Sequence, residues 1–247
     1  LGVRLFHRTT RSQRLTDNGA LFYERCLRAL EEIRGAESQL ETGKHQVNGR
    51  LRVAVPVLFG RQCIAPLLIE LAQEHPGLEL EMSFSDRVVD LVEEGFDMAV
   101  RNGALADSSV LVARRLGEHR MVLCAAPDYL LKNGQPQTVD DLRQHTAINY
   151  TRAGRVLPWQ LMDYDGTSRT FIPRSSLNMD DLQAICDAAL TGHGIAWLPC
   201  WMAIKEIHQG KLVPLLKQAP DVHFDVHAVW QQTPHLPLRV RMAIDTL

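Results

Sequence analysis

Cysteines, histidines and paired carboxylates are the residues of this 247-residue chain that could do catalytic or metal chemistry. Their spacing fits neither. There is no Gly-x-Ser-x-Gly motif and no Cys-x-x-Cys pair, and His193 and Cys200, like the other His/Cys pairs, lack the spacing of metal ligands. Asp180-Asp181 suits the start of a helix better than a catalytic dyad. The sequence therefore predicts a protein that is not an enzyme and holds no metal or cofactor.

Arginine is the other residue type whose placement suggests chemistry. Residues 1–50 hold nine Lys/Arg against six Asp/Glu, whereas residues 51–247 hold 18 against 23. The first fourteen residues contain four arginines and no acid. Such a start suits contact with nucleic-acid phosphates, with Arg8, Arg11 and Arg14 as candidates, although a solvated terminus explains the same charges. Alternating apolar and basic residues over 6–16 predict a short hairpin.

A long helix is expected after this hairpin. Thr16-Asp17-Asn18 is a capping cluster, and the next strong helix stop is Gly43. The helix would have about 26 residues, roughly 39 Å at 1.5 Å per residue. An apolar stripe with alternating steps of three and four, interrupted by Glu37, is typical of a coiled-coil seam. Packing of the stripe on the chain's own body is the alternative to dimerisation. The stripe consists of Tyr23, Cys26, Leu30, Ile33 and Leu40.

From residue 49 onward, short strand patterns alternate with helical ones, which predicts an α/β fold. Strands at 51–56, 78–84 and 96–101, with helices at 63–71 and 88–94 between them, form a doubly wound parallel unit. Strands at 111–116 and 121–125 continue its sheet. The second half is less regular, with expected strands at 147–150, 157–164, 169–172, 177–179, 194–198 and 224–230, and helices at 139–143, 180–190, 201–208 and 236–247.

A small-molecule site is expected beyond the carboxyl ends of these strands, where ligands of doubly wound sheets bind. For Val57, Leu58 and Phe59 the alternative is core packing, and for Arg101 it is an ion pair with Asp97 or a surface carboxylate. The residues predicted to contact the ligand are Pro56, Val57, Leu58, Phe59, Ser85, Asp86, Arg101, Asn102, Cys124, Tyr150, Thr151, Asn178, Met179, Leu198, Pro199 and Trp230.

Several stretches resemble one protein family, the LysR-type transcriptional regulators. LGVRLFHRTTRSQRLTDNG, at the start of the chain, resembles the wing and the beginning of the linker helix in that family. SDRVVDLVEEGFDMAVRNGALADSSVLVARRL, residues 85–116, is similar to its effector-binding domain. GHGIAWLP and GKLVPLL, residues 192–199 and 210–216, are similar to its second-lobe signature. The resemblance covers essentially the whole chain.

The resemblance implies a winged helix-turn-helix, a dimerising linker helix and a two-lobed, periplasmic-binding-protein-like (type 2) effector domain. Residues 1–16 would be the wing and 17–48 the linker helix. Residues 51–124 with 226–247 would form the first lobe and 125–225 the second, with crossings near Cys124 and Asp225. The recognition helix would precede residue 1, so this chain alone is not expected to discriminate operators.

The implied partners are double-stranded operator DNA, a small-molecule effector and further copies of the chain, as a homodimer or homotetramer. Ile64, Leu67, Leu68 and Leu71 would supply part of the contact between effector domains. Members of the family often place Ser or Thr just after the first strand, where it meets a carboxylate effector. Val57 and Leu58 stand there in this sequence, which favours a less polar or aromatic ligand.

A solute-binding protein of a transport system, on the same fold, is the alternative function. Such a protein would carry an export signal and would lack the basic hairpin and the striped helix. No apolar run approaches the 18 or more residues of a membrane span. The five cysteines are expected to be free thiols in a reducing cytoplasm, with Cys124 the one worth testing for redox sensitivity.

Overall fold

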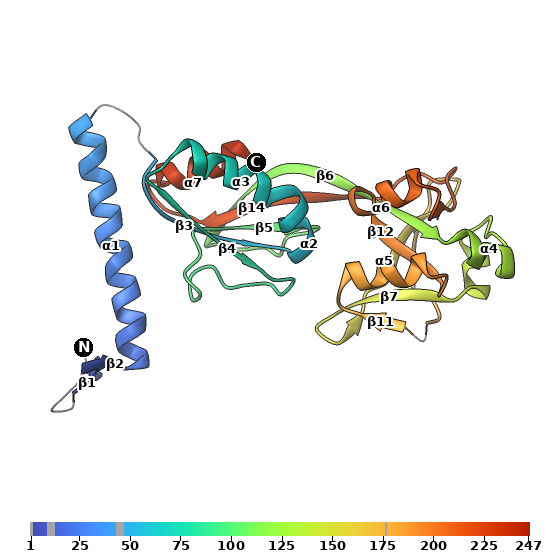
Figure 1. Ribbon diagram of the computed structural model, residues 1–247, viewed down its shortest axis with the longest axis horizontal. Helices are drawn as coiled ribbons and strands as arrows, with labels where there is room; N and C mark the ends of the chain where they lie inside the picture. The colour runs from blue at the N-terminus through green and yellow to red at the C-terminus, as the bar shows by residue number, and fades with distance from the viewer. Residues whose placement is uncertain (1, 9–12, 43–46, 176) are drawn as a thin grey trace.

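The computed structural model describes residues 2–8, 13–42, 47–175 and 177–247. Figure 1 shows three parts in chain order: a long helix with a small hairpin at its N-terminal end, a first α/β lobe, and a second α/β lobe joined to the first by two strands. Within the described ranges no helix is long and apolar enough to span a bilayer.

The predicted hairpin and long helix are both present. Their bounds are β1 (Phe6–Arg8), β2 (Gln13–Leu15) and α1 (Asp17–Thr42). The Thr16 hydroxyl accepts from the Gly19 N–H (2.9 Å) and donates to the Arg4 carbonyl (2.7 Å), so it caps α1 and ties it to the segment that leads into β1. A Cβ on Gly19 would lie 1.9 Å from the Leu5 carbonyl oxygen, which explains a glycine in the first turn.

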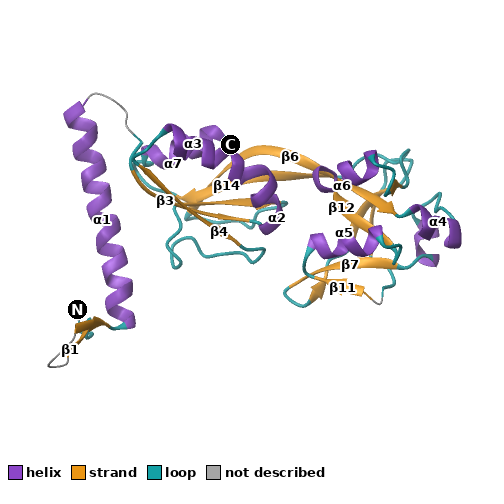
Figure 2. Cartoon of the chain, viewed as in Figure 1, coloured by secondary structure: helices purple, strands orange, loops and turns teal. Residues whose placement is uncertain are grey.

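The first lobe contains the predicted parallel unit. Its sheet has the order β4-β3-β5-β14-β6, with β3 parallel to β4 and β5. Figure 2 shows α3 and α7 on one face of this sheet, where Leu51, Leu68 and Met98 are fully buried. The bounds are β3 (Gly49–Val55), α2 (Val57–Phe59), the π-helical η1 (Gly60–Ile64), α3 (Ala65–Glu74), β4 (Leu78–Phe84), β5 (Met98–Asn102), β6 (Leu111–Ala125), β14 (His223–Gln231) and α7 (Leu238–Thr246).

The helix predicted at 88–94 is wrong, because this segment is a turn that covers the other face of the sheet. Val89 and Leu91 are buried there against Ala54 and Ala99. The buried residues are two apart, as in extended chain, and not three or four apart, as in a helix. Asp90 accepts from the backbone N–H groups of residues 92 and 93, which fixes the turn without a helix.

The two strands predicted at 111–116 and 121–125 are one strand, β6. Gly117, where the prediction broke the strand, pairs with Val226 of β14, and a register shift between Val226 and His227 absorbs the irregularity. Beyond residue 120, β6 pairs with β12 of the second lobe, and Cys124 pairs with Ala196. The crossing therefore comes a few residues earlier than Cys124, while Asp225, paired with Glu118, lies within it.

The second lobe extends β6 with the order β11-β7-β12-β6. The predicted strands and helices are recovered with small shifts in their bounds, and α4, which was not predicted, begins at Pro127 and ends before Gly134. The bounds are α4 (Pro127–Asn133), the 3-10 helix η2 (Asp140–Gln144), β7 (Ala147–Arg152), β8 (Arg155–Val156), β9 (Trp159–Met162), β10 (Ser168–Phe171), β11 (Leu177–Met179), α5 (Leu182–Leu190), β12 (Ile195–Pro199), α6 (Cys200–His208) and β13 (Val213–Pro214).

Candidate ligand-binding site

A cavity of about 390 Å³ lies between the two lobes. The carboxyl ends of β3, β4 and β5 line it from the first lobe, and residues of β7, β12, α5 and α6 line it from the second. The crossing strands β6 and β14 contribute one wall. Its volume falls within the usual range for small-molecule sites.

The rule that ligands bind beyond the carboxyl ends of the strands predicted part of this lining. Residues from both lobes that were predicted to contact the ligand do line the cavity. They are Pro56, Leu58, Phe59, Ser85, Asp86, Arg101, Asn102, Tyr150 and Pro199.

The other predicted contact residues do not line it. Leu198 and Cys124 are fully buried in the core of the second lobe, and Trp230 packs against the core of the first. Burial, together with the neighbouring Cys186 thiol, raises the pKa of the Cys124 thiol to about 12, so it stays protonated. These side chains point into the sheet layers, which the strand-end rule does not distinguish from the cavity side.

Edge positions account for the remaining differences. Thr151 pairs with Val156 in a short antiparallel ladder. Asn178 and Met179 lie on the edge strand β11, where the Asn178 side-chain oxygen accepts from the Asn149 amide (3.2 Å). Val57 turns its backbone N–H toward the Asp86 carboxylate (3.0 Å), and its side chain is not part of the lining.

A row of aromatic side chains, which the sequence did not identify as a unit, forms one wall of the cavity. We call Trp201, Phe59, His119, Phe224 and Trp197 the aromatic row. Successive ring centroids are 5.6, 6.1, 6.0 and 5.7 Å apart, with edge-on contacts at both ends and a stacked contact between His119 and Phe224. Such spacings are typical of favourable ring pairs. The row starts on the second lobe, reaches α2 of the first, and returns along the crossing strands.

The charged groups around the cavity are mostly satisfied by the protein itself. Arg87 forms a bidentate ion pair with Glu94. Arg101 donates to the Val89 carbonyl (3.1 Å) and makes no ion pair with Asp97. Asp97 instead accepts from the backbone N–H of residue 52 (2.8 Å) and pairs with Arg239.

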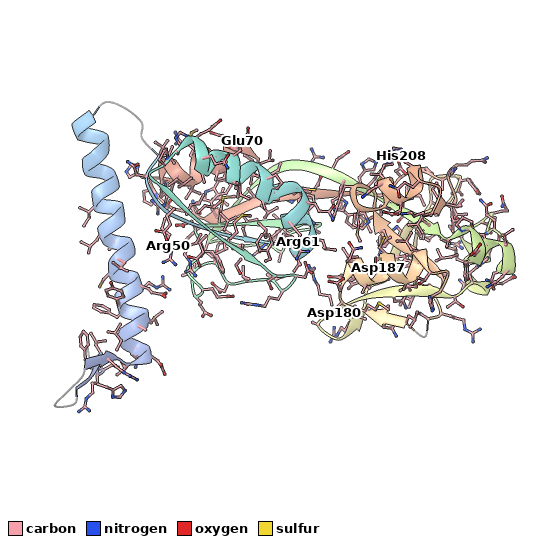
Figure 3. All side chains as sticks on the ribbon, in the orientation of Figure 1. Arg50, Arg61, Glu70, Asp180, Asp187 and His208 are labelled. Carbon is pink, nitrogen blue, oxygen red and sulfur yellow. The ribbon has the colours of Figure 1, made fainter. Side chains whose placement is uncertain are left out.

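Two titratable side chains of the lining are uncharged at neutral pH. Burial lowers the pKa of the His119 imidazole, which favours its neutral form. Burial and the carboxylates of Asp86, Asp180 and Asp181 raise the pKa of the Tyr150 hydroxyl, which outweighs the opposing effect of Arg152 and keeps the group a donor. Figure 3 places Asp180 on the side of the second lobe that faces Arg61 of the first.

Several polar atoms at the cavity are unused. Among the described residues, Asn102 Oδ1, His119 Nδ1 and Trp201 Nε1 lie out of contact with solvent and have no hydrogen-bond partner. All three side chains belong to the cavity lining. A small number of polar groups on a mainly apolar wall is the usual composition of a small-molecule site. No group of three or more His, Cys, Asp or Glu side chains suited to a metal ion occurs in the described part of the chain.

The stripe of α1 is exposed where it is described. Tyr23, Leu30 and Ile33 are 53%, 51% and 55% exposed, and Cys26 is half-buried. The Leu40 side chain lies outside the described residues. Arg25 donates to the Val92 carbonyl of the first lobe (2.7 Å), so α1 touches its own lobe without covering these apolar residues.

The candidate phosphate contacts are only partly described. Arg14 is exposed on β2. Arg8 lies on β1, but its side chain is outside the described residues, as is the whole of Arg11. All three therefore remain predictions.

The expected contact between effector domains needs a correction. Ile64, Leu68 and Leu71 are buried in the core of the first lobe. A helix that lies on a sheet must turn its apolar face inward, and these three form that face. Leu67, at 38% exposure, is the one of the four predicted residues that faces outward.

Comparison with known proteins adds a family model and several relatives. The model described as LysR substrate binding domain matches residues 44–247. An uncharacterized HTH-type transcriptional regulator of Haemophilus influenzae is 35% identical over 240 residues, 97% of this chain and 83% of that protein. The HTH-type transcriptional activator AaeR of Escherichia coli is 33% identical over 250 residues, 100% of this chain and 79% of AaeR.

A solved structure has the same arrangement. CrgA, a LysR-type transcriptional regulator from Neisseria meningitidis, superposes with a TM-score of 0.69 at 30% sequence identity. The match covers 99% of this chain and 84% of CrgA, so it includes the hairpin, the long helix and both lobes.

Proposed function

The chain belongs to the family of LysR-type transcriptional regulators, and we propose that it senses a small molecule between its lobes and regulates transcription by binding double-stranded DNA as an oligomer. The observation that carries this proposal is the apolar stripe of α1, which both lobes leave exposed at Tyr23, Leu30 and Ile33. A monomeric ligand carrier has no use for such a helix. A regulator needs it to hold two DNA-binding heads at a fixed spacing.

The hairpin β1–β2 is proposed to act as the wing of the DNA-binding domain. It lies at the end of α1 that is remote from the lobes, and Arg14 projects from it into solvent. With Arg8 and Arg11 it would contact phosphates, which positions a protein on DNA without reading sequence. We place the protein in the cytoplasm, with the DNA that it would bind.

The crossing strands β6 and β14 are proposed to transmit the signal. A ligand that contacts both lobes favours one angle between them over another, by its difference in affinity for the two states. In an oligomer held together by α1, a change in that angle alters the relative position of the helices and therefore of the DNA-binding heads.

Light scattering on the 27.8 kDa chain tests the proposal. A mass of two or four chains is expected. A strictly monomeric chain at micromolar concentration would contradict the proposal and favour the alternative, a solute-binding protein of a transport system.

A further inference from the structure

Asp86 binds a backbone N–H group on the wall of the cavity. What this contact implies for the ligand rests on the proposed function. The Val57 N–H stands at the start of α2, just after β3, between Pro56 and Leu58, which both line the cavity. Asp86 Oδ1 accepts its hydrogen bond at 3.0 Å. The backbone donor that would otherwise attract a carboxylate ligand at this point is already bound to a carboxylate of the protein.

The charge around this point does not favour a second carboxylate. Asp86, Asp180 and Asp181 all act on Tyr150 against one cation, Arg152, so carboxylates outnumber cations at that corner of the cavity. Two of the three arginines on the lining are engaged: Arg87 pairs with Glu94 and Arg101 bonds to a backbone carbonyl. An anionic ligand beside Asp86 would meet like charge and would lose hydration where the backbone donor of residue 57 is already bound to Asp86.

The walls suit a flat, apolar ligand instead. The aromatic row offers ring faces and edges from the first lobe, the second lobe and both crossing strands. Stacking on such rings selects planar, polarisable molecules. The volume of about 390 Å³ accommodates one or two fused rings.

One polar group on the ligand can be satisfied beside Asp86. A carboxylate has about four acceptor positions, and among the described residues Asp86 accepts one hydrogen bond, from Val57. Asp86 therefore has capacity to accept from a hydroxyl group of a ligand. The Tyr150 hydroxyl, which lines the same corner, can donate to the oxygen of that hydroxyl.

We propose that the inter-lobe cavity binds an uncharged, planar aromatic compound with a hydroxyl group, that is, a phenol without a carboxylate, and that Asp86 is the residue that excludes carboxylates. Asp86 does so by accepting the hydrogen bond of the residue 57 N–H, which is then not available to a ligand, and by repelling a second negative charge. The ring of the ligand lies against the aromatic row, and its hydroxyl faces Asp86.

Matched probe pairs test the proposal on the whole chain. 4-Hydroxybenzamide and 6-hydroxy-2-naphthamide are each compared with the carboxylate of the same shape, 4-hydroxybenzoate and 6-hydroxy-2-naphthoate. Binding is measured by calorimetric titration and by saturation-transfer NMR. We expect at least one amide to bind at least tenfold more tightly than its carboxylate, and benzamide, which lacks the hydroxyl, to bind at least threefold more weakly than 4-hydroxybenzamide.

The Asp86→Asn variant supplies the decisive comparison. Its side-chain oxygen can still accept from the residue 57 N–H, so the fold is retained while the charge is removed. We expect the preference for the amide to fall at least tenfold. Asp128→Asn, an equal loss of charge on the exposed first turn of α4, should leave the preference unchanged.

Three results would overturn the proposal: a wild-type chain that binds the carboxylate as tightly as the amide, an Asp86→Asn variant with the wild-type preference, or no binding of any probe. None of these bears on oligomerisation. A dimer or tetramer that prefers the carboxylate would refute the proposed ligand class and leave the proposed regulator function intact.

Discussion

Truncating the apolar stripe of α1 should break the pairing of chains while leaving each chain folded. The double change Leu30→Ala and Ile33→Ala removes two side chains that lie three residues apart on one side of the helix. Alanine has the highest helix propensity, so α1 itself is retained. Both side chains are exposed in the isolated chain, so the lobes lose no packing.

The size of the effect follows from the exposed fractions. Leu30 and Ile33 are 51% and 55% exposed, so roughly half of each remains to be buried by a partner. Full burial of a Leu or Ile side chain contributes about 1.5–3 kcal/mol, and half of that is about 1 kcal/mol. A symmetric pair buries four such side chains, which gives about 4 kcal/mol, or roughly a 1,000-fold change in dissociation constant.

Sedimentation equilibrium over a range of concentrations measures this change. We expect the double variant to dissociate 100- to 1,000-fold more readily, since each alanine keeps a little of the contact. Leu21→Ala is the matched control: Leu21 is 53% exposed and lies nine residues before Leu30, about two and a half turns away and therefore on the opposite side of α1. Wild-type association of the double variant, or equal weakening by Leu21→Ala, would refute the assignment of the seam.

Three further changes test the fold and the DNA contact. Gly60→Ala would place a Cβ 2.3 Å from Val55 Cγ2 and should lower the free energy of unfolding, measured in urea, by about 1–3 kcal/mol. The loss should be smaller when Gly60→Ala is combined with Val55→Ala. Gly117→Ala, whose Cβ would meet open space, should leave the free energy of unfolding unchanged. Burial lowers the pKa of His119, so the unfolded chain binds more protons and stability should fall as pH drops below about 6.5; His119→Asn should make that fall shallower. Arg14→Ala is tested in a fusion that joins the helix-turn-helix of the Haemophilus relative to the start of this chain. The variant should weaken binding to all duplexes about equally and reduce the slope of log affinity against log salt concentration by about 1. An unchanged slope would reject the phosphate contact.

Periodicity located most of the architecture because most elements bury one regular face. The stripe of α1 and the alternation in β4 follow from geometry that any folded helix or strand must obey. The helix prediction for residues 88–94 failed because the apolar residues of this segment, Val89 and Leu91 among them, lie close enough in sequence to resemble a helical face. Only the folded sheet shows that Val89 and Leu91 pack in one cluster with Ala99 of β5.

The candidate site was predictable on one side only. Strand ends share an edge of a sheet, so residues such as Ser85, Asp86 and Asn102 come together whatever the details of the fold. The aromatic row obeys no such rule, since His119 and Phe224 lie within strands and Trp201 lies at the start of a helix. Their contact depends on how two lobes from distant parts of the chain are placed, which local patterns do not contain.

The same residues that escape sequence reasoning join ligand contact to lobe movement. His119 and Phe224 face each other on the two strands that connect the lobes, with ring centroids 6.0 Å apart. Phe59 of the first lobe contacts His119, and Trp197 of the second lobe contacts Phe224. A planar ligand inserted beside this row must change ring contacts in both lobes and at the connection together, because packed rings have few alternative arrangements. We therefore expect ligand binding to be coupled to the angle between the lobes through the aromatic row, and we expect Phe224→Leu to weaken that coupling even where the cavity is preserved.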